Sequence, residues 1–270
     1  MKIERGMAAV VTGAGSGFGR ACSLALAKRG VRVVVSDLDL DRARETAELV
    51  AAAGGEAQTV RCDVGQAEQV EELARFAERA YGHTDVLVNN AGLAVAGRIG
   101  EIPLEDWKLE VDVNLMGVIY GCHYFVPKMR ARKRGAVLNV ASAAGLLSAA
   151  MMGPYNVTKA GVIALSETLA TEVHGDGIAV TALCPTFFQT QIHLATRAPD
   201  ALKKATERLI TKSSWSADRV AEVALRGLER GELYVIPQLD GKLAWRLKRV
   251  IGSAFYGGLS AKLQARISGS

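Results

Sequence analysis

Short apolar runs alternate with longer amphipathic stretches along most of the chain. The apolar runs indicate strands near residues 7–12, 31–36, 56–61, 85–89, 135–141, 177–184 and 233–236. Helical periodicity separates them near 17–29, 41–53, 66–80, 105–131, 153–174 and 216–230. Several runs are continuously apolar instead of alternating, which is typical of parallel strands buried on both faces. The pattern predicts an α/β fold, with a doubly wound, mostly parallel, Rossmann-like sheet of seven strands and helices on both faces.

Two segments depart from this alternation. Residues 186–213 separate a strand from the next helix, have no strand of their own and contain a short helix near 200–212; an insertion of this length is expected to be a lid over a site. Residues 239–270 follow the last strand. The chain is therefore predicted to be one catalytic domain over 1–238, lid included, with a C-terminal extension over 239–270.

The charge of the chain is concentrated in that extension. The 270 residues carry a net charge of +5, and all of this excess lies beyond residue 239, so the body is neutral. A neutral body argues against nucleic acid as the main ligand. Four dispersed cysteines are expected to be reduced and partly buried, no metal-ligand spacing is visible, and no signal peptide or membrane-spanning run is apparent, so a cytoplasmic enzyme is expected.

A glycine-rich turn follows the first strand. It reads Thr-Gly-Ala-Gly-Ser-Gly-Phe-Gly over residues 12–19, with a GxxxGxG spacing at Gly13, Gly17 and Gly19. Glycines between a strand and a helix let backbone N–H groups approach a pyrophosphate at the positive end of the helix. The turn therefore predicts a dinucleotide site.

Acidic residues end the next two strands. Asp37 follows the second strand, where a carboxylate can accept hydrogen bonds from a ribose 2′-hydroxyl and repels a 2′-phosphate; the alternative is a helix cap or turn acid, a role for which Asp39 and Asp41 are candidates. Asp63 follows the third strand and could contact adenine or cap the next helix. This pattern favours NAD over NADP.

A tyrosine and a lysine lie four residues apart, at 155 and 159, on one face of a predicted helix. A nearby ammonium favours the phenolate, so Lys159 is expected to lower the pKa of Tyr155. Ser142 ends the fifth strand at the same edge of the sheet, and Asn114 lies within a long helix, where asparagine is unfavourable. A tyrosine four residues before a lysine is common by chance, with the tyrosine packed in the core and the lysine in solvent. The same pair together with Ser142 and Asn114 is not common.

Together these features resemble the short-chain dehydrogenase/reductase family, in its compact single-domain subgroup. The resemblance covers roughly residues 5–238, and the matching pieces are 12–19, Asp63, 89–92, Asn114, Ser142 and Tyr155 with Lys159. It implies hydride transfer between the nicotinamide ring and a carbinol carbon, with no metal.

The resemblance also implies a role for each matching residue. The cofactor would be bound by Gly13, Ser16, Gly17, Phe18, Gly19, Asp37, Asp63, Val64, Asn90, Ala91, Gly92, Tyr155, Lys159, Phe188 and Thr190. Ser142 would bind the substrate oxygen and Tyr155 would exchange a proton with it. Lys159 would hold the nicotinamide ribose, and Asn114 would anchor a water that links Lys159 to solvent.

One position departs from the family pattern. After the sixth strand the family has Pro-Gly, whereas this chain has Pro185 followed by Thr186. If that glycine has a positive φ, threonine there would be strained and the loop carrying Phe188 and Thr190 would take another path.

The segments expected to line the substrate site are nearly uncharged. They cover residues 93–96, 144–152 and 187–194, with His193 and Arg197 as the polar candidates. An apolar lining suits a lipophilic secondary alcohol or ketone, although these residues could also simply pack a helix on the sheet.

The extension is amphipathic as well as basic. Its apolar positions include Leu239, Leu243, Leu247, Leu259 and Leu263. Packing on its own body or on a sister subunit is favoured, since family members assemble as homodimers or homotetramers. Peripheral contact with an anionic membrane is the second interpretation, and a frayed extension the third.

The sequence thus predicts an NAD-dependent dehydrogenase for an apolar secondary alcohol or its ketone. Two alternatives remain open at this stage: an NADPH-dependent reductase of carrier-bound ketoacyl groups, and a dinucleotide-binding module without turnover.

Overall fold

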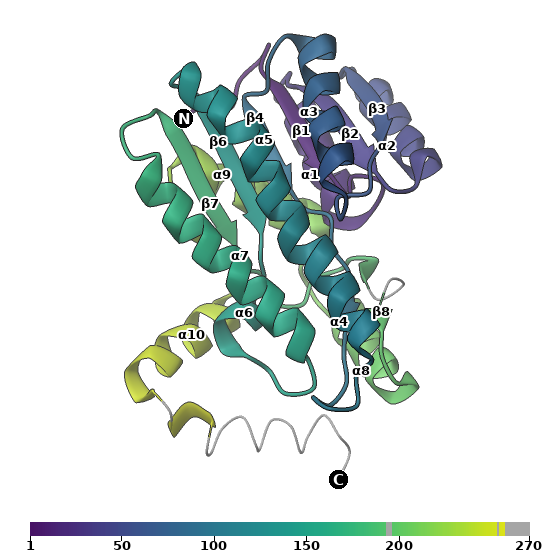
Figure 1. Cartoon of the computed structure of the whole chain (residues 1–270), viewed down its shortest axis with the longest axis vertical. Coiled ribbons are helices and arrows are strands. Elements are labelled where there is room, and N and C mark those ends of the chain that lie inside the picture. The colour runs from purple at the N-terminus through teal and green to yellow at the C-terminus, as the bar shows by residue number, and fades with distance from the viewer. Residues whose placement is uncertain (193–195, 253, 257–270) are drawn as a thin grey trace.

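The computed structural model describes residues 1–192, 196–252 and 254–256. Its main sheet contains the seven predicted strands, all parallel, in the order β3-β2-β1-β4-β6-β7-β9 (Figure 1). They are β1 (Ala8–Thr12), β2 (Arg32–Asp37), β3 (Ala57–Arg61), β4 (Val86–Asn89), β6 (Gly135–Val140), β7 (Ile178–Leu183) and β9 (Tyr234–Val235). The predicted doubly wound, Rossmann-like fold is confirmed.

Helices cover both faces of this sheet. On one face lie α1 (Gly17–Ala27), α2 (Leu40–Ala52) and α9 (Ala217–Glu229); on the other lie α3 (Ala67–Tyr81), α5 (Gly117–Ala131) and α7 (Gly153–Glu172). Alternate residues of one strand serve the two cores: Val10 packs with the α3–α5–α7 side, and Val11 with the α1–α9 side. Burial on both faces explains why the strand sequences are continuously apolar.

The long helix predicted over 105–131 is not a single α-helix. It consists of α4 (Leu104–Val111), a π-helical turn η1 (Asp112–Met116) and α5. Asn114 lies in the middle of the π-helical turn and is fully buried. A π-turn within a helix frequently marks a functional position, which accounts for the unfavourable asparagine.

The prediction that residues 186–213 contain no strand is wrong. Thr196–Arg197 form β8, which pairs with β5 (Ala94–Val95) in a small parallel sheet. β5 and β8 lie outside the main sheet and pair with each other, so identifying them requires the tertiary contact between residues 94–95 and 196–197. The short helix is confirmed as α8 (Asp200–Thr211).

Part of the extension packs on the body, as the favoured interpretation expected. Helix α10 (Leu239–Ile251) lies beside α6 (Ala143–Leu147) in Figure 1. The Trp245 ring contacts Tyr234 at 5.2 Å between centroids, and Lys248 Nζ donates to the Leu146 carbonyl at 2.6 Å. The later apolar positions at 259 and 263 lie outside the described residues.

Two further findings concern the whole described chain. The four cysteines are free and buried, as expected. None of the helices within the described ranges is long and apolar enough to cross a bilayer.

Candidate active site

The candidate site lies at the carboxyl ends of the central strands. The chain leaves β1 for β2 on one side of the sheet and later places β4 on the other side of β1. In doubly wound sheets this reversal opens the crevice in which ligands bind. Most of the predicted site residues follow β1, β2, β3, β4, β6 and β7 at this edge, whereas Asn114 lies in η1 and Tyr155 and Lys159 lie in α7.

The glycine turn after β1 needs glycine at each patterned position. Gly13 and Gly17 have φ values of +61° and +51°, in the left-handed region. A Cβ on Gly19 would lie 2.2 Å from the Gly13 carbonyl oxygen. Ser16 is the N-cap of α1 but makes no side-chain cap hydrogen bond, so the first turn of α1 keeps N–H groups for an anion.

Asn90 supports this turn from the end of β4. Its Nδ2 donates to the carbonyls of Thr12 at 2.8 Å and Gly13 at 2.9 Å. The backbone of Ala91 lies against the turn, where a Cβ on Gly13 would come within 2.7 Å of its Cα. The side-chain amide of Asn90 therefore shapes the turn.

The Asp37 carboxylate closes the other side of the turn. It accepts hydrogen bonds from Gly15 N–H at 2.8 Å and Asp39 N–H at 3.0 Å. The cap of α2 is Asp39, which accepts from Asp41 and Arg42 N–H groups. Asp37 is therefore a turn acid beside the glycines, and Asp39 has the helix-cap role that was the alternative for it.

Asp63 also lies in a turn. Its Oδ1 accepts from Gly65 N–H at 3.0 Å, while Gln66 is the N-cap of α3. The helix-cap alternative for Asp63 is therefore wrong. Val64 beside it is buried against Gly117, where a Cβ would approach the Val64 side chain to 2.8 Å.

Ser142, Tyr155 and Lys159 come together, as their spacing predicted. Ser142 caps α6, accepting from Ala144 N–H at 3.1 Å, and its hydroxyl is close enough to the Tyr155 phenol to lower the pKa of that phenol. Lys159 Nζ lies 5.7 Å from the centroid of the Tyr155 ring and donates to the Val140 carbonyl at 2.8 Å. The phenol thus lies near both the serine oxygen and the lysine amine.

The expected lowering of the Tyr155 pKa is wrong for the protein by itself. Burial raises the pKa of Tyr155 to about 12, although the hydrogen bond from Ser142 acts in the opposite direction. Burial also lowers the pKa of Lys159 to about 8, with Glu110 and Cys184 opposing it. For both Tyr155 and Lys159, the effect of burial on the pKa is larger than the opposing effects of neighbouring groups.

Asn114 extends this group to the next loop. Its Nδ2 donates to the Leu93 carbonyl at 2.8 Å, and its Oδ1 accepts from Leu93 N–H at 2.9 Å. A Cβ on Gly92 would lie 3.0 Å from Asn114 Oδ1 and 3.5 Å from Lys159 Nζ. Glycine at 92 therefore leaves open the space that Asn114 and Lys159 both border.

Glu110 is a member of this group that the sequence analysis missed. It is fully buried in α4, where Oε1 accepts from Asn114 Nδ2 at 3.0 Å and Oε2 accepts from Val95 N–H at 3.1 Å. Burial raises the pKa of Glu110 to about 8, and the charge of Lys159 opposes that rise. The signal for it was an acid one helical turn before Asn114, on the same inward face.

The loop after β7 reaches the glycine turn despite its missing glycine. Thr186 does not have a positive φ, so the backbone strain expected for a threonine at this position does not arise. Phe188 packs edge-on against Phe18 at 6.3 Å between centroids. A Cβ on Gly17 would lie 2.8 Å from Thr190 Oγ1, so Thr190 is next to the turn.

The apolar segment after Ser142 has an unusual backbone. Ser148 and Met151 have φ values of +54° and +65°, which cost energy for residues with a side chain and are enriched at functional sites. Across from it, Arg197 pairs with Asp106 at 2.5 Å. His193, the other polar candidate, lies outside the described residues.

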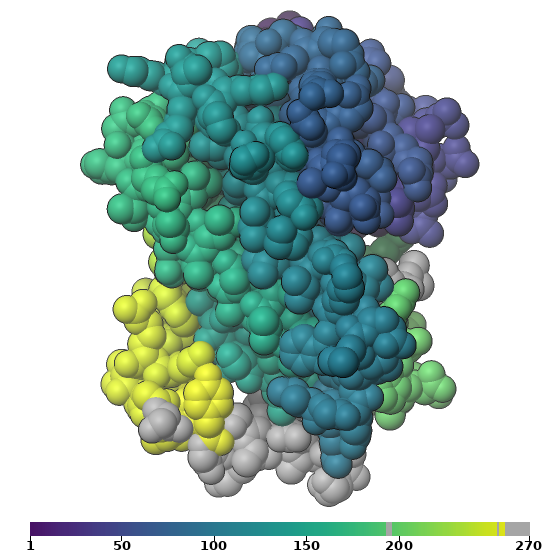
Figure 2. All heavy atoms as spheres, in the orientation of Figure 1, coloured from purple at the N-terminus to yellow at the C-terminus, as the bar shows by residue number. Residues whose placement is uncertain are grey.

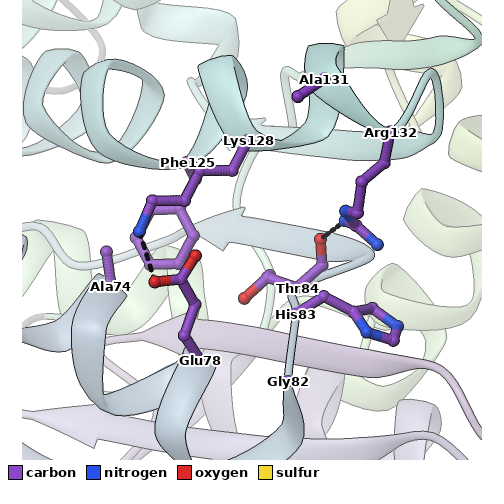
Figure 3. Close-up of a pocket in the computed structure, with 9 residues that line it drawn as sticks. All are labelled: Ala74, Glu78, Gly82, His83, Thr84, Phe125, Lys128, Ala131 and Arg132. Atoms are coloured by element: carbon purple, nitrogen blue, oxygen red, sulfur yellow. Dashed lines mark hydrogen bonds and ion pairs between the residues drawn. The ribbon is translucent and has the colours of Figure 1, made fainter.

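A separate hollow of about 260 Å³ lies between α3 and α5, at the opposite end of the sheet (Figure 3). Its charged groups already have partners: Lys128 pairs with Glu78 at 2.7 Å, and Arg132 donates to the Thr84 carbonyl at 2.5 Å. The hollow is remote from the glycine turn and from Tyr155, so it is no part of the candidate active site.

Comparison with known proteins agrees with this geometry. The short chain dehydrogenase family model matches residues 7–201. The cyclohexanol dehydrogenase of an Acinetobacter species is 36% identical, covering 68% of this chain and 74% of its own. A 3-oxoacyl-[acyl-carrier-protein] reductase of Synechocystis is 38% identical, covering 68% and 75%. A short-chain dehydrogenase/reductase of Burkholderia phymatum, crystallised with NAD, superposes with a TM-score of 0.88 at 33% identity, covering 92% and 95%.

A doubly wound sheet with a glycine turn and a Ser–Tyr–Lys group defines a nucleotide-dependent oxidoreductase class, and the chain belongs to the short-chain dehydrogenase/reductase family. It is an oxidoreductase of that type, a class that acts on CH–OH groups with a nicotinamide dinucleotide.

Proposed function

We propose that this protein is an NAD-dependent dehydrogenase that interconverts an apolar secondary alcohol and its ketone. The observation that carries the proposal is the proximity of the Ser142 hydroxyl and the Tyr155 phenol, with Lys159 beside them, at the edge of the sheet that holds the glycine turn. A module that only bound a dinucleotide would not need this combination of hydroxyl, phenol and ammonium.

The cofactor fits a cradle that only glycines leave open. Gly13, Gly17 and Gly19 expose backbone N–H groups and the start of α1 to the pyrophosphate, with Ser16 and Phe18 between them. When bound, the nicotinamide accepts or supplies the hydride. The remaining contacts are proposed for Asp63 and Val64 at adenine, Asn90, Ala91 and Gly92 along the adenosine side, and Phe188 and Thr190 at the nicotinamide.

The proton is handled by Tyr155. Because its pKa is about 12 in the protein alone, it holds its proton at neutral pH and can donate it to the oxygen of a ketone as the hydride reaches the carbonyl carbon. Ser142 orients that oxygen, and Lys159 restores the proton through the space bordered by Asn114. In alcohol oxidation the same atoms move in reverse.

The choice of NAD rests on Asp37. Its carboxylate lies beside the glycine turn, where it would accept hydrogen bonds from an adenosine ribose and where a 2′-phosphate would meet a like charge. Arg20 and Arg42, the nearest guanidinium groups, are paired with Glu45 and Asp39.

Steady-state kinetics with the two cofactors tests this choice. We expect kcat/KM to favour NADH over NADPH by about 100-fold or more, because like-charge contacts cost several kcal/mol. Asp37→Asn should lose most of that preference, whereas Asp41→Asn, which changes an exposed acid in the first turn of α2, should keep it. An unchanged preference in Asp37→Asn would refute the role of Asp37.

An apolar substrate is favoured by the lining of the site. Ala94 and Val95 are buried beside Asn114, and the segment after Ser142 is uncharged over 143–152. The cyclohexanol dehydrogenase relative acts, by its name, on an alcohol of this kind. A panel of secondary alcohols with graded ring size and chain length, assayed with NAD, should show kcat/KM rising with apolar area; a preference for sugars or hydroxy acids would contradict it.

A reductase of carrier-bound ketoacyl groups is the second candidate, and the Synechocystis relative carries that name. Asp37 disfavours the NADPH that such enzymes generally use. The basic residues near 128–134 that could receive an acidic carrier are engaged in ion pairs, Lys128 with Glu78 and Arg130 with Asp176.

Two partners beyond the substrate are proposed. The chain forms a homodimer or homotetramer, which light scattering measures. The outer face of α10 contacts an anionic membrane, since it carries exposed leucine and valine side chains next to basic ones.

A further inference from the structure

Glu110 has a chemical environment that sets it apart from the other acids of the described chain. It is the only carboxylate there with no exposed surface, and it lies one helical turn before Asn114. Both of its oxygens accept hydrogen bonds from N–H donors, at 3.0 Å from Asn114 and 3.1 Å from Val95. An isolated buried carboxylate is costly, so this residue needs a compensating partner.

The opposite charge that acts on Glu110 is that of Lys159. Each of the two groups shifts the titration of the other toward its charged form, as an opposite charge does. Lys159 donates its hydrogen bond to the neutral Val140 carbonyl, and Asn114, which is bonded to Glu110, borders the same space over Gly92 as Lys159 Nζ.

Building on the proposed function, we propose that Glu110 is a positioning residue of the catalytic group: its carboxyl fixes the orientation of the Asn114 amide and, once ionised, retains the proton on Lys159. The residue touches neither substrate nor the reacting atoms. It acts through Asn114 on one side and through Lys159 on the other.

The hydrogen bonds of the Asn114 side chain fix which way its amide points. Its Nδ2 donates to Glu110 and to the Leu93 carbonyl, which leaves Oδ1 to accept from Leu93 N–H and to face the space over Gly92. A flipped amide would place an oxygen against the Glu110 oxygen and the Leu93 carbonyl. Glu110 therefore keeps an acceptor, not a donor, directed toward Lys159.

Four ionisable groups surround Glu110 and Lys159: Asp106, Arg197, Cys184 and Tyr155. Glu110 is faced by Lys159 from α7 and by Asp106 from its own helix, and Asp106 is itself paired with Arg197 of β8. Lys159 is faced by Glu110 and by Cys184, whose thiol burial keeps protonated. Tyr155 is faced by Glu110, whose charge raises its pKa. As pH rises, the Glu110 carboxylate forms and holds the last proton of the pair on Lys159.

Nuclear magnetic resonance of the chain with ¹³Cε-labelled lysine tests this without any turnover. The Lys159 signal is identified by its loss in Lys159→Met. In Glu110→Gln we expect the pKa of Lys159 to fall by about one unit or more, because the opposing charge is gone. Glu105→Gln, which removes an exposed acid from the same helix, should leave it unchanged; an unchanged Lys159 pKa in Glu110→Gln would overturn the proposal.

A second measurement uses the unsubstituted protein, in case Glu110→Gln fails to fold. With ¹³C-labelled glutamate and lysine, the Glu110 carboxyl and Lys159 signals should shift over the same pH interval. Independent titrations of the two groups would overturn the proposal.

Kinetics then separates this proposal from the proposed function. With cyclohexanol and NAD as probes, Glu110→Gln should move both limbs of the kcat profile to lower pH, since Tyr155 and Lys159 both lose their protons earlier. If the unsubstituted protein oxidises no alcohol with either cofactor, the proposed function fails while the Lys159 titration still decides the role of Glu110.

Discussion

At the scale of single residues, the site depends on small side chains as much as on reactive ones. Gly19 lets the start of α1 lie directly under the turn, and Gly92 leaves open the space beside Asn114 and Lys159. The reactive residues could be predicted from their spacing, because Tyr155 and Lys159 are one helical turn apart. The titration of Tyr155 could not, since it depends on burial that only the folded chain reveals.

Gly19→Ala tests the glycine turn. The added methyl group would lie 2.2 Å from the Gly13 carbonyl, so the turn must move and the N–H groups that face the pyrophosphate move with it. We expect the Kd for NADH, measured by fluorescence titration, to rise by about tenfold or more, the equivalent of one lost hydrogen bond to a charged group.

Gly54→Ala is the matched control. Gly54 has a positive φ but open space around it and lies far along the chain, after α2. The Gly54→Ala protein should have a lower free energy of unfolding, because alanine is strained at a positive φ, but its Kd for NADH should be unchanged. A Gly19→Ala protein that binds NADH normally would contradict the proposed cradle.

At the scale of elements, short and irregular pieces are what the sequence pattern could not predict. The seven strands of the main sheet and the main helices were evident because most of them bury apolar side chains in a run or along one face. The π-helical turn at Asp112–Met116 and the two-residue strands β5 and β8 depend on tertiary contacts, such as those of Asn114 with Leu93 and of Arg197 with Ala96. All three surround the candidate site.

Helix α10 differs from the other helices because it packs on the body with one side and exposes apolar and basic side chains on the other. Its inner side packs on Tyr234 and α6, while Leu239, Leu243 and Val250 are 68%, 55% and 84% exposed on its outer side. The exposed basic residues Lys242, Arg246 and Arg249 flank that apolar stripe. Helix α10, yellow in Figures 1 and 2, contacts α6, whose N-cap is Ser142, so a membrane bound by α10 would lie on the same side as the candidate active site.

Co-sedimentation with lipid vesicles tests that surface. We expect binding to phosphatidylcholine vesicles containing about 30% phosphatidylglycerol, weaker binding at high salt, and little binding to pure phosphatidylcholine. Leu243→Asp combined with Val250→Asp should abolish it, whereas Leu49→Asp on α2 should not. If the double variant instead changes only the oligomeric state, the face covers a second copy of the chain and the membrane proposal is wrong.

At the scale of the whole molecule, the sheet brings together residues that are far apart in the chain. The glycine turn at 12–19, the loop at 89–92, Ser142 and the loop at 184–190 all follow carboxyl ends of strands, so one edge of the sheet brings the candidate cofactor-binding and catalytic residues together. The candidate active site lies in the neutral body, whereas the proposed surface contact lies in the basic extension. This arrangement could be predicted from the alternation of strands and helices, because the topology of a parallel sheet fixes which ends meet.

The central claim is that the Tyr155 hydroxyl carries the proton beside the bound dinucleotide. Tyr155→Phe removes that oxygen and keeps the ring, so kcat for alcohol oxidation should fall by about 10²–10⁴-fold while the Kd for NADH stays within about twofold. Turnover equal to that of the unsubstituted protein would contradict the account.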